Sequence, residues 1–206
     1  MVAGLNSSPL VLEVHPALPV NKVSEFIAHA KANPGKITMA SYGAGSISHV
    51  AGELFKTATG INTLHVPYRG SGPMLTDLLG GQVQCAFDNL PASVEHIKAG
   101  RLRALAVTTA SRSEVLPQIP SLRELLPGYE ASAFFGLAAP KATPIAVIGK
   151  LNEAVNAVLA DRKVVGRLAE LGGAPLLLSP TAFGKLVVDE TDKWAKVIRA
   201  ANIKAE

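Results

Sequence analysis

The fold of this chain is decided by the stretch Lys36-Ile37-Thr38-Met39-Ala40-Ser41-Tyr42-Gly43-Ala44-Gly45-Ser46-Ile47-Ser48-His49. Residues 36–41 read as a β-strand, and residues 47–59 read as an amphipathic helix with its apolar side chains on one stripe. Gly60 follows this helix at the position where a glycine commonly ends a helix. A strand joined to a helix by a short glycine-rich loop is typical of an α/β fold.

The same unit recurs on both sides of this stretch. Further strands are predicted at residues 10–14, 62–66, 83–87 and 103–108, and further helices at residues 21–32, 73–79 and 91–99. Asn21 is the expected N-cap of the first of these helices. Because parallel strands need a long crossover, strands that alternate with helices predict an α/β fold with parallel crossovers.

The pattern changes near residues 110–130. Residues 111–127 contain three prolines and predict a connector with one short helix near residues 121–126. Beyond it, residues 131–139 form one convincing strand, a weaker strand is predicted at 176–178, and helices are predicted at 145–159, 163–171 and 181–201. A lone apolar strand lacks sheet partners, so this second part is expected to need a partner from outside the chain.

Composition excludes several classes of protein. The 206 residues are 48% hydrophobic and 17% charged, which excludes a disordered chain. The net charge is +4, but the Lys and Arg residues are scattered, so no nucleic-acid partner is expected. The single cysteine, Cys85, lies in an apolar strand and is expected in the core. Residues 1–6 show no basic segment followed by an apolar one, so no signal peptide is visible and the compartment stays open.

The glycine loop is the first candidate binding segment. If the loop binds a ligand, the free N–H groups at the start of the helix and the hydroxyls of Ser46 and Ser48 form an anion site. If it has only a structural role, Ser46 caps the helix. The candidates here are Ser41, Gly43, Gly45, Ser46, Ser48 and His49. A dinucleotide site is disfavoured because the third glycine of its fingerprint is missing. A serine hydrolase using Ser46 or Ser48 with His49 and Asp88 is an alternative without a supporting motif.

Two more candidate segments follow later strands. Tyr68, Gly70 and Ser71 lie in a loop before a helix, where backbone N–H groups and a hydroxyl can hold a carboxylate; Arg69 reads as a solvated loop residue. Asp88 and Asn89 end the strand at 83–87, where they either cap a turn or contact a ligand. Ligands of open α/β sheets bind outside the carboxyl ends of strands, where all three segments lie. The histidines and the cysteine show no metal-ligand spacing, and Trp194 reads as a core residue.

Nine stretches form an ordered set along the chain: residues 30–36 (AKANPGK), 43–55 (GAGSISHVAGELF), 65–70 (HVPYRG), 75–83 (LTDLLGGQV), 87–91 (FDNLP), 97–108 (IKAGRLRALAVT), 126–130 (LPGYE), 135–140 (FGLAAP) and 194–198 (WAKVI). This set closely resembles the periplasmic solute receptors of tripartite tricarboxylate transporters, the Bug (TctC-like) family. The resemblance implies a periplasmic-binding-protein-like fold of type II, with one complete α/β lobe at residues 1–125 and the C-terminal part of the other lobe at residues 126–206.

The resemblance also implies a function. It implies a non-catalytic receptor, without cofactor or metal, that closes on a small organic carboxylate or an amino acid and serves the membrane components of the transporter. The eleven candidate residues would form the ligand loops, and the location would be periplasmic. The family's N-terminal segment has no counterpart here, so the chain is expected to be a truncated receptor. The alternative is a remnant without ligand function that forms a swapped homodimer through its unpaired strand.

Overall fold

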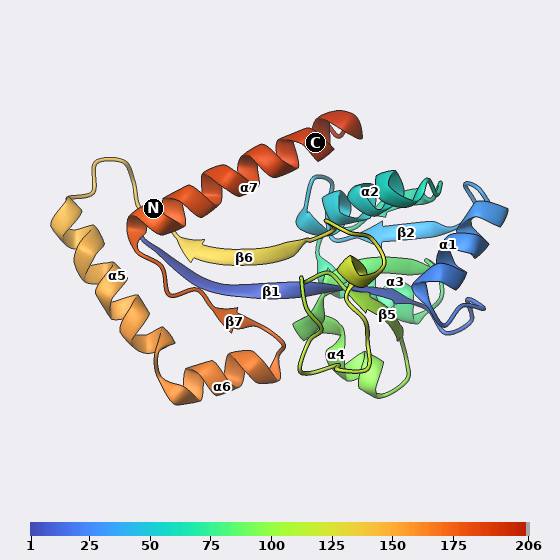
Figure 1. Ribbon diagram of the computed structural model, residues 1–206, viewed down its shortest axis with the longest axis horizontal. Helices are drawn as coiled ribbons and strands as arrows, with labels where there is room; N and C mark the ends of the chain where they lie inside the picture. Colours follow the sequence, from blue (N-terminus) through green and yellow to red (C-terminus); the bar gives the residue numbers. More distant parts are fainter. Residues whose placement is uncertain (205–206) are drawn as a thin grey trace.

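A computed structural model of the chain describes residues 1–204. Seven strands form one twisted sheet system, with helices on both sides (Figure 1). The elements are β1 (Ala3–Val14), α1 (Val23–Ala32), β2 (Thr38–Ser41), α2 (Ile47–Thr59), β3 (Leu64–Pro67), α3 (Ser71–Leu79), β4 (Cys85–Asn89), α4 (Leu90–Lys98), β5 (Arg103–Val107), the 3-10 helix η1 (Leu122–Glu124), β6 (Ser132–Leu137), α5 (Ile145–Leu159), α6 (Arg162–Glu170), β7 (Ala174–Pro175) and α7 (Pro180–Ala200).

The larger sheet has the strand order β3-β2-β4-β1-β5. β2 is parallel to β3 and to β4, which confirms the predicted crossovers at α2 and α3. β1 runs antiparallel to both β4 and β5, so the expectation of parallel neighbours is wrong at this position. The strand–loop–helix units therefore place the ends of β2, β3 and β4 at one edge of the sheet.

β1 is much longer than the predicted strand at residues 10–14. Its second half pairs with β4 and β5, whereas its first half pairs with β6, from Ala3 opposite Leu137 to Pro9 opposite Ser132. β7 pairs with β1 as well, at Ser7 opposite Ala174. The expectation of a lone strand in the second part is therefore wrong, because β1 extends from the larger sheet and supplies its partner. The division of the chain at residues 125 and 126 stays a prediction.

The main core lies between the larger sheet and helices α1 and α2. Phe26, Phe55 and Phe87 are fully buried there, and Tyr129 closes the cluster with its ring edge against Phe55. Cys85 is also fully buried, as predicted, and burial raises the pKa of its thiol. Because this core fixes α2 against β4, it also fixes the loop that joins β2 to α2.

Three local predictions differ from the structure. Asn21 does not cap α1: Lys22 is the N-cap residue, and the Asn21 N–H donates to Glu25 Oε2 at 2.7 Å. The weak strand predicted at 176–178 lies instead at Ala174–Pro175. Trp194 is half-buried on α7 rather than fully enclosed.

Helix α7 connects the two ends of the molecule. It begins near the N-terminus and runs along the long axis until it lies over α2 (Figure 1). None of the helices between residues 1 and 204 is long and apolar enough to cross a membrane. The far end of α7 and the strand β6 thus lie on the same side of the molecule as the start of α2 (Figure 1).

Candidate functional site

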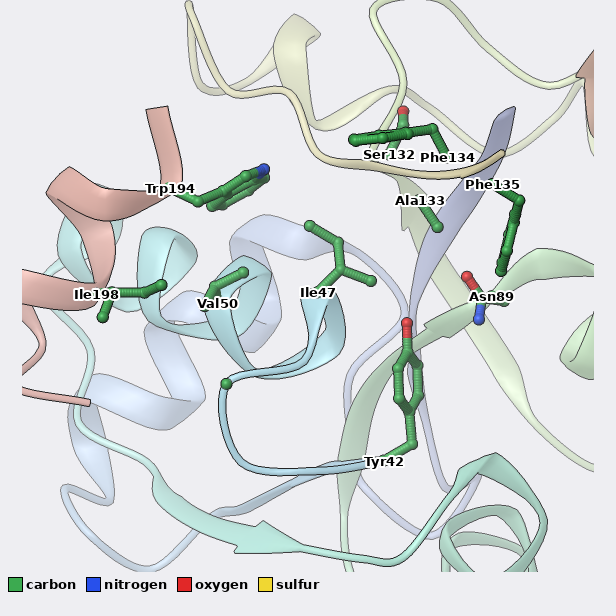
Figure 2. Close-up of a pocket in the computed structure, with 11 residues that line it drawn as sticks. Tyr42, Ile47, Val50, Asn89, Ser132, Ala133, Phe134, Phe135, Trp194 and Ile198 are labelled. Atoms are coloured by element: carbon green, nitrogen blue, oxygen red, sulfur yellow. The ribbon is translucent and has the colours of Figure 1, made fainter. Parts of the chain in front are cut away.

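A cavity of about 360 Å³ lies where β6 and α7 face the start of α2 (Figure 2). This volume is at the lower end of the range for small-molecule pockets. The cavity is lined by residues from the β2–α2 loop, α2, the end of β4, β6 and α7: Tyr42, Gly45, Ile47, Val50, Asn89, Ser132, Ala133, Phe134, Phe135, Trp194 and Ile198.

The glycine loop positions the start of α2 at the cavity wall. Gly45 has a φ of 72°, a left-handed conformation that favours glycine, and it lines the cavity directly. Ser46 is the N-cap residue, and its hydroxyl accepts from the His49 N–H at 3.4 Å and donates to the Gly43 carbonyl at 2.7 Å. The structural reading of Ser46 as a cap is thereby confirmed. The cap leaves the first turn of α2 directed at the cavity.

Three other predicted residues of this loop face the protein interior. Ser48 is buried and donates its hydroxyl to the Phe87 carbonyl. Ser41 is also buried, with Oγ at 2.7 Å from His65 Nε2. His49 accepts from the Gly45 N–H at 3.0 Å through Nδ1. These contacts hold the loop in shape, and none of the three side chains lines the cavity.

The second predicted loop lies beside the first. The Tyr68 N–H donates to the Ser41 carbonyl at 2.8 Å, which joins the two loops through the backbone. The Tyr68 hydroxyl donates to Asp77 Oδ2 at 2.8 Å, so it is directed to α3 rather than to the cavity. Gly70 has a φ of 121° at the N-cap position of α3, and the Ser71 hydroxyl donates to Asp88 Oδ2 at 2.7 Å.

The third segment brings Asp88 and Asn89 beneath the same loops. Asp88 is fully buried and accepts from the Ser71 hydroxyl and from the Asn89 N–H, and burial raises the pKa of its carboxyl. Asn89 occupies the N-cap position of α4 without a side-chain capping bond, so the predicted capping contact is absent. Its side chain lines the cavity instead, and its Oδ1 atom is buried without a hydrogen-bond partner among the described residues.

Tyr42 is a polar residue of the cavity that the sequence analysis did not single out. Its hydroxyl points toward the amide of Asn89 in Figure 2. Burial, followed by the nearby charge of Asp88, raises the pKa of Tyr42 to about 12, although Asn89 and the backbone of Ser48 act in the opposite direction. The phenol therefore keeps its proton at neutral pH and is available as a hydrogen-bond donor.

The structure thus brings all three predicted segments together, but only Gly45 and Asn89 of the predicted residues line the cavity. Ser41, Gly43, Ser46, Ser48, His49, Tyr68, Gly70, Ser71 and Asp88 lie behind it or around it. The sequence missed the opposite wall, which consists of Ser132–Phe135 of β6 with Trp194 and Ile198 of α7. Two adjacent aromatic residues in β6 were the one signal for that wall, since an ordinary strand buries only alternate residues.

The geometry gives no support to the serine-hydrolase alternative. The Ser46 and Ser48 hydroxyls donate to backbone carbonyls rather than to the ring of His49. The serine that does contact a histidine ring is Ser41, which is 1% exposed. The space beside that pair has a volume of about 10 Å³, which is too small for an ester substrate.

Two proteins with similar sequences are longer than this chain. Protein BugT of Bordetella pertussis is 38% identical over 204 residues, which cover 98% of this chain and 63% of BugT. A UPF0065 protein of Pseudomonas sp. strain P51 is 36% identical over 92% of this chain and 57% of its own length. The chain therefore spans about three fifths of these curated relatives.

Two solved structures with the same fold are described with small carboxylates. The structure described as R. palustris Rpa4515 with adipate has a TM-score of 0.93 and 39% identity, over 98% of this chain and 68% of that one. MatC of Rhodopseudomonas palustris with bound malate has a TM-score of 0.86 and 31% identity, over 96% of this chain and 68% of that one. The family model described as tripartite tricarboxylate transporter family receptor, TctC, matches residues 1–203. The chain belongs to the TctC family of transporter receptors.

Proposed function

We propose that this chain is a solute receptor that captures a small organic carboxylate in the cavity between α2, β6 and α7, without bond chemistry. In this proposal the captured solute passes to the membrane components of a tripartite tricarboxylate transporter, and the receptor acts in the periplasm. The observation that carries the proposal is the cavity at the start of α2, in a chain of the TctC family. Relatives solved with adipate and with malate support the same class of ligand.

The polar end of the cavity suits a carboxylate without a formal positive charge. The first turn of α2 has N–H groups that lack partners within the helix, of which Ser46 accepts that of His49, and a positive dipole end, which favours an anion. The Tyr42 hydroxyl adds a donor that stays protonated at neutral pH, and the amide of Asn89 adds another beside it. Neutral donors and bridging waters are sufficient to hold a carboxylate in a partly enclosed site.

Trp194 provides a direct test, because it is the single tryptophan of the chain and lines the cavity. We expect its fluorescence to change in a saturable way when adipate, malate or a simple monocarboxylate is titrated. The melting temperature should rise in parallel, since a ligand at a hundred times its dissociation constant adds about 2.7 kcal/mol of stability. A cooperatively folded sample that shows neither change with any of these carboxylates would contradict the proposal.

Two tyrosines form a matched pair for the polar end. Tyr42→Phe removes the hydroxyl at the cavity and should weaken carboxylate binding about tenfold, the usual loss for a hydrogen bond to a charged group. Tyr68→Phe is the control, because the Tyr68 hydroxyl is directed to Asp77. Equal affinities of the two variants would remove Tyr42 from the binding site.

We also propose a homodimer that forms through β6. β6 is paired with β1 on one side, so the proposal rests on its other edge. Among the described residues β6 pairs with β1 alone, which leaves its other edge open. Phe135 and Leu137 on this strand are 48% and 41% exposed. An open apolar edge favours pairing with a second chain. Light scattering tests the proposal: a dimer that is lost on Ala133→Pro supports it, and a monomer at high protein concentration contradicts it.

A further inference from the structure

The candidate cavity has a polar end and a long apolar end. Tyr42 and Asn89 lie together at one end in Figure 2, while Trp194 and Ile198 lie at the other. Ile47, Phe134 and further apolar side chains form the walls between them. None of the described residues that line the cavity is Asp, Glu, His, Lys or Arg.

Two lysines near the cavity are engaged with carboxylates. Lys193 precedes Trp194, but its Nζ lies 3.1 Å from Glu190 Oε1, and its side chain lines a neighbouring cavity together with Glu130 and Glu190. Lys56 lies 2.8 Å from Glu53, behind the glycine loop. The described residues that line this cavity therefore include no cation to neutralise a second or third carboxylate of a ligand.

The buried carboxyl group of Asp88 further disfavours a ligand with several carboxylates at the polar end of the cavity. Asp88 is fully buried next to Asn89 and acts on the phenol of Tyr42. A ligand with several carboxylates would lose its hydration close to this group without gaining a counter-ion, and that loss is costly. One carboxylate at the start of α2 avoids the cost, because the rest of the molecule can be uncharged.

The apolar walls are held in place before any ligand arrives. The indole N–H of Trp194 donates to Glu190 Oε2 at 2.7 Å, which fixes the plane of the ring. Phe134 packs edge-on against the buried Phe183, with ring centroids 6.2 Å apart. Side chains that are already ordered lose little entropy on binding, so their contact area contributes fully to affinity.

We infer that the cavity selects a monocarboxylate with an apolar aliphatic or aromatic body over a dicarboxylate or tricarboxylate. The inference rests on the proposed receptor function and refines its ligand class. The cavity volume of about 360 Å³ suits a small acid of this kind. The carboxylate lies at Tyr42 and the first turn of α2, and the apolar body lies along Ile47 and Phe134 toward Trp194.

A chain-length series tests the inference. Butanoate, hexanoate, malate and citrate are titrated into the whole chain at neutral pH, with calorimetry and Trp194 fluorescence as readouts. Each buried methylene should strengthen binding about fourfold, so hexanoate should bind about sixteenfold more tightly than butanoate. Hexanoate should also bind more tightly than malate and citrate.

The other outcomes separate the two proposals. If malate or citrate binds more tightly than hexanoate, or if the two monocarboxylates bind equally, the inference is overturned while the receptor function stands. If no carboxylate binds to folded protein, the receptor function itself is contradicted.

Two residues of one strand provide matched variants. Phe135 and Leu137 lie two positions apart on β6 and therefore face the same side, and both are partly exposed, but only Phe135 lines the cavity. Phe135 lies beside Asn89 at the polar end in Figure 2, so Phe135→Ser should weaken the binding of hexanoate and of butanoate alike, whereas Leu137→Ser should leave both unchanged. If the two variants change the affinity equally, or if Phe135→Ser does not change it, the proposed contact between Phe135 and the ligand is contradicted.

Discussion

The imidazole ring of His49 lies flat against that of His65, with ring centroids 3.6 Å apart and 8° between the planes. The pair joins the first turn of α2 to β3 behind the glycine loop. His65 Nε2 lies 2.7 Å from the Ser41 hydroxyl, and His49 Nδ1 accepts from the Gly45 N–H. Two stacked histidines thus hold both ends of the loop that borders the cavity.

This pair predicts a loss of stability in mild acid. Burial, followed by the charge of His49, lowers the pKa of His65 to about 4. The unfolded chain binds the proton at about pH 6.5, so the free energy of unfolding falls as the pH drops from there toward the folded pKa. His65→Phe keeps a flat ring without the titration. Wild type should lose about 1–2 kcal/mol more than this variant between about pH 7 and pH 4.5, after allowance for partial exposure.

Urea unfolding at several pH values measures this difference. His29→Phe is the control, because His29 lies on α1, away from the glycine loop. Parallel pH profiles of wild type and His65→Phe would show that His65 does not titrate between the folded and unfolded states as predicted.

A second prediction concerns two buried carboxyl groups. The Ser93 hydroxyl lies 2.9 Å from Glu13 Oε1 and 3.3 Å from Asp88 Oδ2, and all three residues are fully buried. Asp88 also accepts from the Ser71 hydroxyl and the Asn89 N–H, whereas Glu13 Oε2 is buried without a hydrogen-bond partner among the described residues. Burial, and then the charge of Asp88, raises the pKa of Glu13 well above its usual value. Glu13 is therefore the group that we expect to be protonated in the folded protein.

The sign of the resulting pH dependence is opposite to that of His65. The folded state holds a proton that the unfolded state releases above about pH 4.3, so this contribution to stability decreases as the pH rises. Glu13→Gln removes the penalty and should raise the free energy of unfolding by at least about 1 kcal/mol near pH 8, with a smaller gain near pH 4.5.

Denaturant unfolding of Glu13→Gln at both pH values measures the effect. Glu95→Gln is the control, since its side chain is 79% exposed. A Glu13→Gln variant that is destabilised equally at both pH values would mean that Glu13 acts through shape or hydrogen bonding rather than through its proton.

The sequence predicts the local helices and strand–loop–helix units of the fold well. The helix at 145–159 was predicted with both boundaries, and α2 with its caps at Ser46 and Gly60 was predicted as well. These features depend on residues close in sequence, such as an N-cap serine or a left-handed glycine. Periodicity and capping are therefore sufficient to predict them.

The long-range pairing of β1 was missed for a physical reason. Asn6-Ser7-Ser8-Pro9 interrupts the apolar pattern of the strand, and its partner β6 lies more than a hundred residues away. Polar residues and a proline lower the apparent β-propensity even where the backbone is extended. The second wall of the cavity was missed with it, because Phe134 and Trp194 reach the glycine loop only through that pairing and through the course of α7.

A third prediction concerns the contact of α5 with the residue before β1 and with the segment between β7 and α7. Asn152 is buried, and its Nδ2 donates to the Val2 carbonyl at 2.9 Å and to the Leu178 carbonyl at 2.8 Å. Asn152→Ala leaves two carbonyls without this donor and should lower the free energy of unfolding by about 2–3 kcal/mol. Asn156→Ala, one turn later, should cost less, because its amide bonds are longer. Equal losses in the two variants would contradict a special role for Asn152.

The last prediction concerns the contact between β6 and α7. A Cβ atom on Gly136 would lie 2.0 Å from Phe183 Cζ and 2.8 Å from the Ala3 carbonyl oxygen. Phe183 is buried and packs against Phe134, so its ring cannot swing away. Gly136→Ala should therefore lower the free energy of unfolding by about 3 kcal/mol, as overpacked cores do. Thermal and urea unfolding measure the loss.

A second substitution distinguishes this steric cause from a general effect of replacing glycine. Adding Phe183→Leu to Gly136→Ala shortens the opposing side chain, so the double variant should recover part of the stability lost in Gly136→Ala alone. Gly149→Ala is the matched control: a Cβ there meets no atom within 4 Å, and the position lies inside α5. It should gain about 0.5–1 kcal/mol, because alanine restricts the unfolded chain and favours the helix. If Phe183→Leu restores nothing, the ring of Phe183 is not what excludes a side chain at residue 136, and the approach of β6 to the Ala3 carbonyl is the remaining cause.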